Sequence, residues 1–437
     1  MRAVVVALGK VGLPLATQLA SAGHEVTGCD IDGRVVERVN AGRSPFPGEA
    51  GLDEALAAAV AGGRLRATGN TTSAVAERPD LVVAVPPLYV DQDAQPDWRA
   101  LDAVVADIGA GLRPGTTVAI ETTVPVGSTR TRIAPALEEA SGLRAEEDFW
   151  VVFSPERVFS GRVLRDLATY PKLVGGLSER GEARGVDLYG AFLDADVWSM
   201  GSAEAAELAK LAETTYRDLN IGFANELARH ADALGLDVDR VIAAANSQPF
   251  SHIHRPGVAV GGHCIPVYPR FYLAGDSEAR LPAVARDVNA AMPAYAVELL
   301  AGALGGLAGE RVLVLGVAYR GGVKETAFSG ALTLRDELAA RGATALAHDP
   351  LFDDAELRAL GFEPWDAAPV AGAILQADHA EYRALAGDDL PGARAVVDGR
   401  GILDATRFGV PVLRIGGGQA PSAASSATTR SPARPSP

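Results

Sequence analysis

Cysteine is scarce in this chain: Cys29 and Cys264 are the only two among 437 residues. Two cysteines cannot build a disulfide framework or a conventional zinc site with several thiolate ligands. The sequence therefore predicts a reduced protein, for which the cytoplasm is the expected compartment. It gives no basis for a metal site.

Long hydrophobic runs and an excess of positive charge are also absent. No apolar stretch reaches the roughly 20 residues that a membrane-spanning helix needs. The apolar start at 1–8 is interrupted by Gly9, Lys10 and Gly12, which disfavours a signal peptide. The 55 acidic residues exceed the 40 Lys and Arg residues, so the formal net charge is −15. We therefore expect neither nucleic acid nor a membrane as a partner, although a local basic pocket for a phosphate is compatible with this charge.

Apolar material is plentiful, because hydrophobic residues make up 48% of the chain and charged residues 22%. This composition is typical of globular domains with well-packed cores. At roughly 150 residues per domain, the length suggests about three domains, or two joined by a substantial linking element.

The first part of the chain alternates short β-branched runs with longer stretches rich in Ala and Leu, which is typical of βα units on a parallel sheet. The predicted strands are 2–8, 25–29, 81–85, 117–121, 150–154 and 172–174, and the first predicted helix is 13–22. From Ser202 to about Leu236 the pattern changes to one long helix with apolar residues at helical spacing. Further helices are predicted near 238–245 and 283–302.

A second βα alternation begins after residue 306. Its predicted strands are 311–315, 343–348, 371–375 and 395–397, with a helix at 330–340. The predicted fold class is therefore α/β, with two Rossmann-like units joined by a central long-helix domain. We expect domains at 1–198, 199–304 and 305–415. The segment 416–437 is almost wholly Gly, Ala, Ser, Thr, Pro and Arg, which predicts a disordered tail.

A glycine-containing turn separates the first predicted strand from the first predicted helix, where a dinucleotide-binding loop belongs. Its sequence is Ala7-Leu8-Gly9-Lys10-Val11-Gly12. Glycine lets the backbone approach a pyrophosphate, and the helix N-terminus presents free N–H groups to it. Asp30 ends the second strand and is placed to accept hydrogen bonds from an adenosine ribose, which favours NAD over NADP despite the nearby Arg34. The alternative is an ordinary tight turn in a Rossmann-like fold.

Cys264 belongs to a second motif, Gly261-Gly262-His263-Cys264-Ile265-Pro266. Glycines before a cysteine leave room around the sulfur, and a thiol captures an aldehyde as a thiohemiacetal when some thiolate is available. A lone cysteine is more often a small buried hydrophobic residue, so both interpretations stay open on this motif alone. His263 has no second ligand in the pattern and is expected to be structural.

Lys210 lies on the predicted long helix, with Glu207, Glu213, Thr214 and Arg217 within two turns. One interpretation is a solvated helix face with ion pairs at i,i+3 and i,i+4. The other is a cation that stabilises a developing alkoxide. The sequence pattern does not decide between them.

Two polar motifs come directly after predicted strands. Pro155-Glu156-Arg157 offers a carboxylate that can act as a base toward water. Glu121-Thr122-Thr123-Val124-Pro125 comes at the edge where open α/β sheets place ligands. Taken alone, each motif is more simply explained as a turn.

In combination and in this order, these features resemble the UDP-glucose/GDP-mannose dehydrogenase family. The likeness covers roughly residues 1–415 and includes the second Rossmann-like unit. Phe153-Ser154-Pro155-Glu156-Arg157 and the motif at 261–266 are most similar to the branch that oxidises UDP-N-acetylhexosamines. The resemblance implies an enzyme that oxidises C6 of a nucleotide sugar from alcohol to carboxylate, with two NAD in succession.

The resemblance also implies a role for individual residues. Cys264 would trap the aldehyde and then carry a thioester. Lys210 would stabilise oxyanions, Glu156 would assist thioester hydrolysis, and Thr123 would help to hold the catalytic water. The residues implied for NAD are Gly9, Lys10, Val11, Gly12, Asp30, Pro86 and Thr123. Those implied for the substrate are Arg157, Gly261, Arg320 and Arg400.

Arg320 and Arg400 would serve the nucleotide diphosphate in the last unit. Arg320 stands where the family has a lysine, and Arg400 matches a family arginine. A cation suits phosphate at either position, and a guanidinium can bind it bidentately. The implied assembly is a homodimer formed through the central helices.

Three departures from the family pattern bear on the identity of the sugar, the rate of the second oxidation and the choice of base. Tyr268 stands where the family has an aspartate four residues after the cysteine, and Thr214 replaces an asparagine four residues after the lysine. The acidic stretch beyond the phosphate-binding lysine is replaced by 321–329. A phenol, with an unperturbed pKa near 10, is a poor base at pH 7 unless a cation lowers that pKa.

Two other functions are compatible with parts of the sequence. A two-electron dehydrogenase of the 3-hydroxyacid type also joins a Rossmann unit to a helical dimer domain, but it needs neither Cys264 nor a second Rossmann-like unit. A nucleotide-sugar-binding or regulatory protein without turnover would explain Tyr268 and Thr214.

Overall fold

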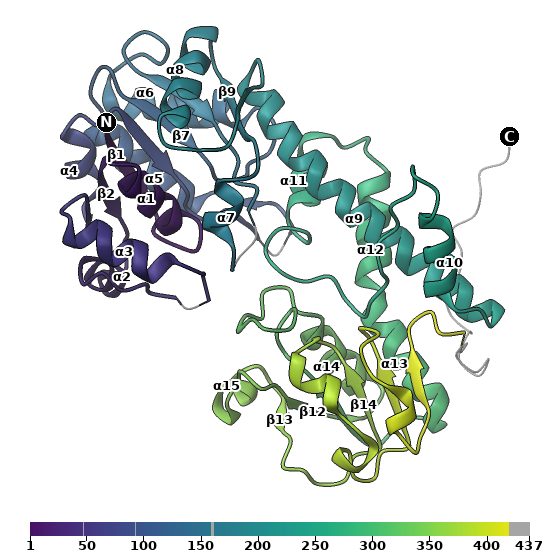
Figure 1. The fold of residues 1–437 in the computed structure, drawn as a ribbon. Helices are drawn as coiled ribbons and strands as arrows, with labels where there is room; N and C mark the ends of the chain where they lie inside the picture. Colours follow the sequence, from purple (N-terminus) through teal and green to yellow (C-terminus); the bar gives the residue numbers. More distant parts are fainter. Residues whose placement is uncertain (47, 92, 159–160, 419–437) are drawn as a thin grey trace, which may run out of the picture. The chain divides into compact units, whose positions relative to one another are not determined.

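The structure is a computed structural model, and it describes residues 1–418 except 47, 92, 159 and 160. The chain divides into two compact units (Figure 1). The first unit contains Met1–Thr214 and Arg270–Glu278, and the second contains Thr215–Pro269 and the chain from Ala279 onward. Each unit contains one large sheet. Within the part of the chain that the structure describes, no helix is long and apolar enough to cross a membrane.

The sheet of the first unit has eight strands in the order β10-β9-β8-β7-β4-β1-β2-β3. These strands are β1 (Arg2–Val6), β2 (Glu25–Cys29), β3 (Leu65–Thr68), β4 (Leu81–Ala84), β7 (Thr117–Ile120), β8 (Trp150–Phe153), β9 (Lys172–Gly176) and β10 (Val197–Ser199). From β3 to β8 all neighbours are parallel, as the sequence predicts. β9 is antiparallel to β8, and β10 is parallel to β9. The last two strands therefore run against the rest of the sheet, which the sequence pattern did not indicate.

Helices cover this sheet, and their apolar sides form its core. They are α1 (Gly12–Ser21), α2 (Gly33–Asn40), α3 (Leu52–Ala61), α4 (Thr71–Ala76), α5 (Arg99–Gly111), the π-helix η1 (Thr129–Ile133), α6 (Ala134–Ser141), α7 (Val163–Leu167) and α8 (Glu179–Gly190). Leu15 and Leu19 of α1 are fully buried in one cluster with Val5 of β1. A short hairpin, β5 (Tyr89–Val90) with β6 (Pro96–Asp97), comes after β4.

The predicted long helix is confirmed as α9 (Ala203–Leu234), which begins in the first unit and continues into the second. The next helices are α10 (Val238–Asn246) and, after the cysteine motif, α11 (Tyr268–Gly275). The helix predicted near 283–302 is confirmed, but it consists of two helices, α12 (Leu281–Ala290) and α13 (Met292–Leu304). Pro293 lies in the first turn of α13. Proline lacks the N–H that would continue a preceding helix, so it begins a new one.

The sheet of the second unit has six strands, all parallel, in the order β13-β12-β11-β14-β15-β16. Its strands are β11 (Arg311–Leu315), β12 (Thr344–His348), β13 (Glu363–Pro364), β14 (Gly372–Leu375), β15 (Ala395–Asp398) and β16 (Val412–Arg414). Its other helices are α14 (Gly330–Ala340), α15 (Asp354–Ala359) and the 3₁₀ turns η2 (Ala380–Ala384), η3 (Gly387–Asp389) and η4 (Ala405–Arg407). The predicted α/β class with two Rossmann-like units and a long central helix is thereby confirmed.

The predicted tail begins at residue 416, and its first residues are placed by hydrogen bonds. The backbone N–H groups of Gly416 and Gly418 donate to the Asp232 carboxylate at 2.9 and 2.8 Å. Residues 419–437 lie outside the described part of the chain. The division into domains at 1–198, 199–304 and 305–415 stays a prediction.

Candidate active site

The predicted dinucleotide loop joins β1 to α1 in the first unit. Ala7 has φ of 75°, in the left-handed region that side chains other than glycine rarely adopt. A Cβ on Gly12 would lie 2.0 Å from the Ala7 carbonyl oxygen, so only glycine lets α1 start this close to the strand. Gly9 and Lys10 are exposed before the helix. The backbone of this loop at the N-terminus of α1 can therefore approach a pyrophosphate.

Asp30 is held beside this loop by the backbone. One carboxylate oxygen accepts from the N–H of Leu8 at 2.8 Å, and the other accepts from the N–H of Asp32 at 2.9 Å. Arg34, whose position raised the question of NADP, donates through Nε and Nη2 to Asp32 at 3.1 and 2.9 Å. This turn therefore presents the carboxylates of Asp30 and Asp32, and Arg34 is already paired with Asp32. Such a turn suits the ribose hydroxyls of NAD better than the 2′-phosphate of NADP.

Glu156 lies just beyond β8 with both carboxylate oxygens engaged. Oε1 accepts from the backbone N–H of Arg157 at 2.6 Å, and Oε2 is 3.0 Å from Lys172 Nζ. The same Nζ is 3.0 Å from Oε1 of Glu121, which comes directly after β7. The structure therefore brings the strand-end residues Glu121 and Glu156 to one amine, an arrangement that no sequence motif indicated.

Burial controls the acidity of this cluster. It raises the pKa of Glu121 to about 7, although the Lys172 charge opposes the rise. Burial also raises the pKa of Tyr189, whose hydroxyl donates to Glu121 Oε1. For Lys172 burial lowers the pKa, but the carboxylates Glu121 and Glu156 outweigh it, so the net shift is upward and the amine stays charged.

Thr123 and Pro86 lie where the turns after β7 and β4 meet. Thr122 Oγ1 donates to the Pro86 carbonyl at 2.6 Å, and Thr123 and Pro86 are buried. Both turns lie at the same sheet edge, because β4 and β7 are parallel neighbours. Thr123 and Pro86, which are predicted to border NAD, therefore lie at the same sheet edge as Glu121.

Lys210 is buried on α9, as are Glu207 and Thr214. Glu207 accepts from the backbone N–H of Thr129 at 2.9 Å, from its hydroxyl at 2.6 Å, and from the N–H of Gly127 at 2.5 Å. Burial raises the pKa of Glu207. The Glu207 carboxylate therefore holds the turn that leads into η1. This side of α9 is not a solvated face with ion pairs.

Two neighbours of Lys210 also have defined partners. Thr214 Oγ1 donates to the Lys210 carbonyl within the helix at 3.1 Å, so the hydroxyl proton is used locally. Glu213 accepts from Arg157 Nε at 2.8 Å, which joins α9 to the Glu156 loop. Arg157, predicted to touch substrate, is thus fixed by Glu213.

The cysteine motif belongs to the second unit, where it packs against the loop between β11 and α14. A Cβ on Gly261 would lie 2.7 Å from Tyr319 Cβ, and Gly262 has φ of 91°. The N–H of Gly262 donates to the Ala327 carbonyl at 2.8 Å. Glycine is required at Gly261 because a Cβ would meet Tyr319 and the Phe328 carbonyl, and at Gly262 because of its left-handed φ. Cys264 itself is exposed.

His263 and the two substrate arginines lie around the same loop. His263 Nε2 pairs with a Glu325 carboxylate oxygen, a partner that the sequence pattern did not indicate. Arg320 is exposed. Arg400 donates through Nη1 to the Ala259 carbonyl and through Nη2 to the Tyr319 carbonyl, each at 3.3 Å. The second unit thus gathers Gly261, Cys264, Arg320 and Arg400 around one loop, whereas Lys210, Glu156 and Thr123 belong to the first unit.

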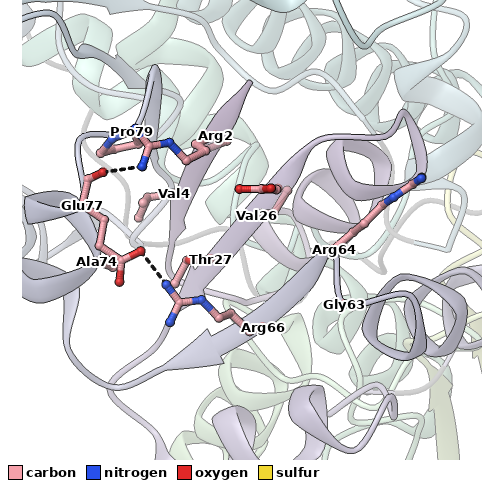
Figure 2. Close-up of a pocket in the computed structure, with 12 residues that line it drawn as sticks. Arg2, Val4, Val26, Thr27, Gly63, Arg64, Arg66, Ala74, Glu77 and Pro79 are labelled. Atoms are coloured by element: carbon pink, nitrogen blue, oxygen red, sulfur yellow. Dashed lines mark hydrogen bonds and ion pairs between the residues drawn. The ribbon is translucent and has the colours of Figure 1, made fainter.

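A pocket of about 120 Å³ lies elsewhere in the first unit (Figure 2). Its lining includes Arg2 and Glu25, the first residues of β1 and β2, so it is at the opposite sheet edge from Asp30. Arg66 pairs with Glu77 at 2.6 Å, and Arg2 donates to the Glu77 carbonyl at 2.8 Å. This pocket contains none of the predicted site residues.

Family models match three successive segments of the chain. They are the NAD binding domain at residues 1–193, the central domain at 204–291 and the UDP binding domain at 313–405 of one family. The chain belongs to the UDP-glucose/GDP-mannose dehydrogenase family. It is an NAD-dependent oxidoreductase, and the predicted family and cofactor are confirmed.

Relatives of this dehydrogenase extend over nearly the whole chain. It is 32% identical over 430 residues to a UDP-N-acetyl-D-mannosamine dehydrogenase of Pyrococcus horikoshii, which covers 96% of this chain and 100% of the relative. It is 34% identical to an NDP-N-acetyl-D-galactosaminuronic acid dehydrogenase of Ralstonia solanacearum, over 92% of this chain and 96% of the relative.

Solved structures agree with this result. A structure of the Pyrococcus horikoshii UDP-D-ManNAc dehydrogenase matches with a TM-score of 0.87 and 31% identity, over 96% of this chain and 100% of that one. A UDP-glucose dehydrogenase from Pyrobaculum islandicum matches with a TM-score of 0.84 and 31% identity, over 94% of this chain and 96% of that one. These matches extend over all three segments and not over one domain alone. The segment at 313–405 is therefore part of this dehydrogenase, although a two-electron 3-hydroxyacid dehydrogenase would not need it.

Proposed function

We propose that this dehydrogenase oxidises the C6 alcohol of a UDP-N-acetylhexosamine, or of a related UDP-hexose, to the uronic acid in two successive two-electron steps. The observation that carries this proposal is the exposed thiol of Cys264, set in a glycine turn against the loop that bears Arg320. The names of the relatives support a UDP-N-acetylhexosamine. A two-electron dehydrogenase of the 3-hydroxyacid type would not need the Cys264 thiol.

Bound NAD would accept one hydride from C6 in each oxidation. In the first, the alcohol gives up its proton to water, and the Lys210 ammonium stabilises the developing oxyanion. The Cys264 thiolate then bonds to the aldehyde carbon, and the former carbonyl oxygen takes a proton from water to give a thiohemiacetal. Loss of that hydroxyl proton to water and of the second hydride leaves a thioester. Glu156 takes a proton from water positioned with the help of Thr123, the water oxygen bonds to C6, and the C6–Sγ bond breaks to release the acid and the thiolate.

The two cysteines support this assignment by their difference. Cys29 ends β2 inside the first unit, and burial raises its thiol pKa to about 12. Cys264 is exposed and comes after two glycines and His263. A nucleophile must be reachable by the substrate, so the exposed Cys264 is the residue suited to covalent catalysis.

We propose that the second unit holds the nucleotide diphosphate. Arg320 is exposed on the loop after β11, where a guanidinium can meet a phosphate bidentately. Arg400 keeps that loop against the segment before Gly261 through its carbonyl contacts. Arg157 would contact substrate from the Glu156 loop in the first unit.

We also propose a homodimer formed through the central helices. In the second unit Tyr216 and Phe223, two turns apart on α9, are 55% and 53% exposed, and Leu281 and Val284 of α12 are 71% and 55% exposed. Large apolar side chains exposed along helices are typical of an interface. The mass in solution tests this point, and a monomer at assay concentration would contradict it.

The test of the function is the stoichiometry of the purified protein with a panel of UDP- and GDP-sugars. The proposal expects two NADH for each uronic acid formed from a UDP-sugar. One NADH with accumulated aldehyde would refute the thioester half, and a protein that binds the sugar nucleotide without reducing NAD would be the non-catalytic alternative.

Replacing Cys264 with Ser should reduce acid formation by at least about 100-fold, because the hydroxyl is a far weaker nucleophile than a thiolate. Cys29→Ser is the matched control, since it removes the other thiol from the chain. Acid formation at the wild-type rate by Cys264→Ser would rule out the covalent route.

A further inference from the structure

Lys172, at the start of β9, lies between two carboxylates at the edge of the first unit's sheet. Its Nζ is 3.0 Å from Glu121 Oε1 and 3.0 Å from Glu156 Oε2. Lys172 is 4% exposed and Glu121 is 2% exposed. Solvent therefore screens these interactions little, and each partner strongly affects the others.

The direction of β9 explains how the amine reaches this edge. β7 and β8 are parallel, so Glu121 and Glu156 both lie beyond the carboxyl ends of their strands. β9 pairs with β8 in the antiparallel sense, through Phe153 and Gly175. The first residue of β9 therefore lies at the edge where β8 ends, whereas a parallel β9 would have carried Lys172 to the opposite edge.

Contacts fix the orientation of Glu156 from two sides. The N–H of Arg157 donates to Oε1 at 2.6 Å, and the Lys172 ammonium donates to Oε2 at 3.0 Å. One donor on each oxygen holds the carboxylate in a single orientation. A base toward water must be correctly aimed, and these contacts provide that condition.

Glu121 is the second anchor of the amine. Tyr189 donates to Oε1 of Glu121, while Oε2 accepts no hydrogen bond from any described residue. Two buried carboxylates beside one cation favour binding of one proton. Burial raises the pKa of Glu121 to about 7, while the carboxylates raise the pKa of Lys172, so the amine stays charged between its two partners.

We propose that Lys172 is a positioning residue for Glu156: anchored on Glu121, it holds the Glu156 carboxylate oriented for the attack of water on the thioester. This inference rests on the proposed function, in which Glu156 accepts the proton of that water. Lys172 forms no bond to substrate and acts only through Glu156.

The test compares Lys172→Met with the wild-type enzyme, using UDP-N-acetyl-D-mannosamine and NAD between pH 4 and 9. Without the ammonium, the Glu156 carboxylate loses one of its two orienting donors and a neighbouring positive charge. We therefore expect kcat at pH 7 to fall by about 100-fold, the order of a general-base contribution, and the acidic limb of the kcat profile to move up by at least about one pH unit. KM for the sugar nucleotide should change less than about threefold, because Lys172 does not touch substrate.

Lys172→Arg is the conservative variant and should recover the wild-type pH profile to within about half a unit, since it keeps the charge at the same edge. Arg66→Met is the matched control: it breaks the exposed pair with Glu77 at the opposite sheet edge, drawn in Figure 2, and should leave the profile unchanged. A lysine with only a structural role would lower the stability of the protein without moving the pH profile.

A double-variant comparison separates this inference from the proposed function. In the Glu156→Gln background, Lys172→Met should change kcat less than about threefold, because the base on which it acts is gone. Wild-type acid formation by Glu156→Gln would refute the role of Glu156 and with it the proposed hydrolysis step. An impaired Glu156→Gln together with an unshifted profile for Lys172→Met would overturn this inference alone.

Removing Lys172 leaves a buried carboxylate without its cation, which can prevent folding. If Lys172→Met does not fold, the double variant Glu121→Gln with Lys172→Met removes that charge as well, and the same pH profile is measured. An acidic limb shifted upward supports the inference, and an unshifted limb overturns it.

Discussion

The two Rossmann-like units begin in the same way and then diverge. Ala7 comes directly after β1 and Gly316 directly after β11, with φ of 75° and 91°. Both residues donate their N–H to the last residue of the neighbouring strand at 2.8 Å. Asp30 and Asp349 come next after those neighbouring strands, and each accepts from the backbone just beyond the first strand, also at 2.8 Å.

Beyond this shared start, the two units differ in the length of the loop and in the burial of the aspartate. In the first unit α1 begins at Gly12 and Asp30 is only partly buried. In the second unit the chain continues through 316–329 before α14, and Asp349 is buried against His379 at 3.1 Å. The first carboxylate is therefore available to a ribose, whereas the second is enclosed. The longer loop carries Arg320 and packs on the turn of the cysteine motif instead.

The substitution with the largest expected effect is Gly12→Ala in the dinucleotide loop of the first unit. Its Cβ would lie 2.0 Å from a backbone oxygen that cannot move without distorting the loop. We expect NAD affinity to fall by at least about 100-fold, because the first turn of α1 can no longer approach the pyrophosphate. Titration calorimetry with NAD measures this. A Cβ on Gly9 meets nothing within 4 Å, so Gly9→Ala is the control for stability. Unchanged NAD affinity in Gly12→Ala would contradict the assignment of the loop.

The next effect compares the two aspartates. Asp349→Asn should lower the free energy of unfolding by about 3 kcal/mol, because it removes a buried charge that is hydrogen-bonded to His379. Asp30→Asn should change stability by less than about 1 kcal/mol but weaken NAD binding by about tenfold. Denaturation curves and NAD titrations of the two variants check both predictions. Equal losses of stability would contradict the difference in burial between Asp30 and Asp349.

The Asp349 contribution also has a defined pH dependence. Burial raises the pKa of this carboxyl, but the bonds from His379 and from the N–H groups of Leu351 and Ala318 outweigh it, so the net pKa lies below 3.8. A depressed pKa means that the stabilisation is present above about pH 4 and is lost as the pH falls through the folded-state pKa. The stability difference between wild type and Asp349→Asn should therefore shrink in that acidic range.

The smallest effect concerns the first residue of each loop. Ala7 has a side chain in a conformation that Gly316 adopts without strain. Ala7→Gly should stabilise the protein by up to about 1 kcal/mol, since relief of strain is partly offset by the greater freedom of the unfolded chain. The converse change, Gly316→Ala, should destabilise, because its Cβ would lie 2.4 Å from Ala377 Cβ. Thermal melting of both variants checks the signs, and a loss of stability in Ala7→Gly would contradict the strain at Ala7.

Much of this framework could be predicted because it is encoded locally. A strand, a glycine turn and a helix at 2–22, and then a strand that ends in Asp30, form a pattern that short-range preferences produce. The same is true of α9, whose apolar spacing persists for its full length. Pro293 carried a local signal as well, and it should have divided the helix predicted at 283–302.

The residues that escaped prediction depend on contacts between distant parts of the chain. Glu207 looks like a surface charge on its helix, and only the turn at 127–129 makes it a buried acceptor. Lys172 looks like the first residue of an ordinary strand. Its contacts with Glu121 and Glu156 depend on the antiparallel direction of β9. Residue preferences within the strand do not determine that direction.

The reversed β9 has a consequence for how the protein tolerates change. The position of Lys172 is set by the strand ladder to β8, not by the length of the connection that leads to it. Lengthening that connection at the exposed Gly161 should leave the amine in place, since surface loops accept insertions at a small entropic cost. Engineering could therefore change the length of this connection while Lys172 keeps its contacts with Glu121 and Glu156.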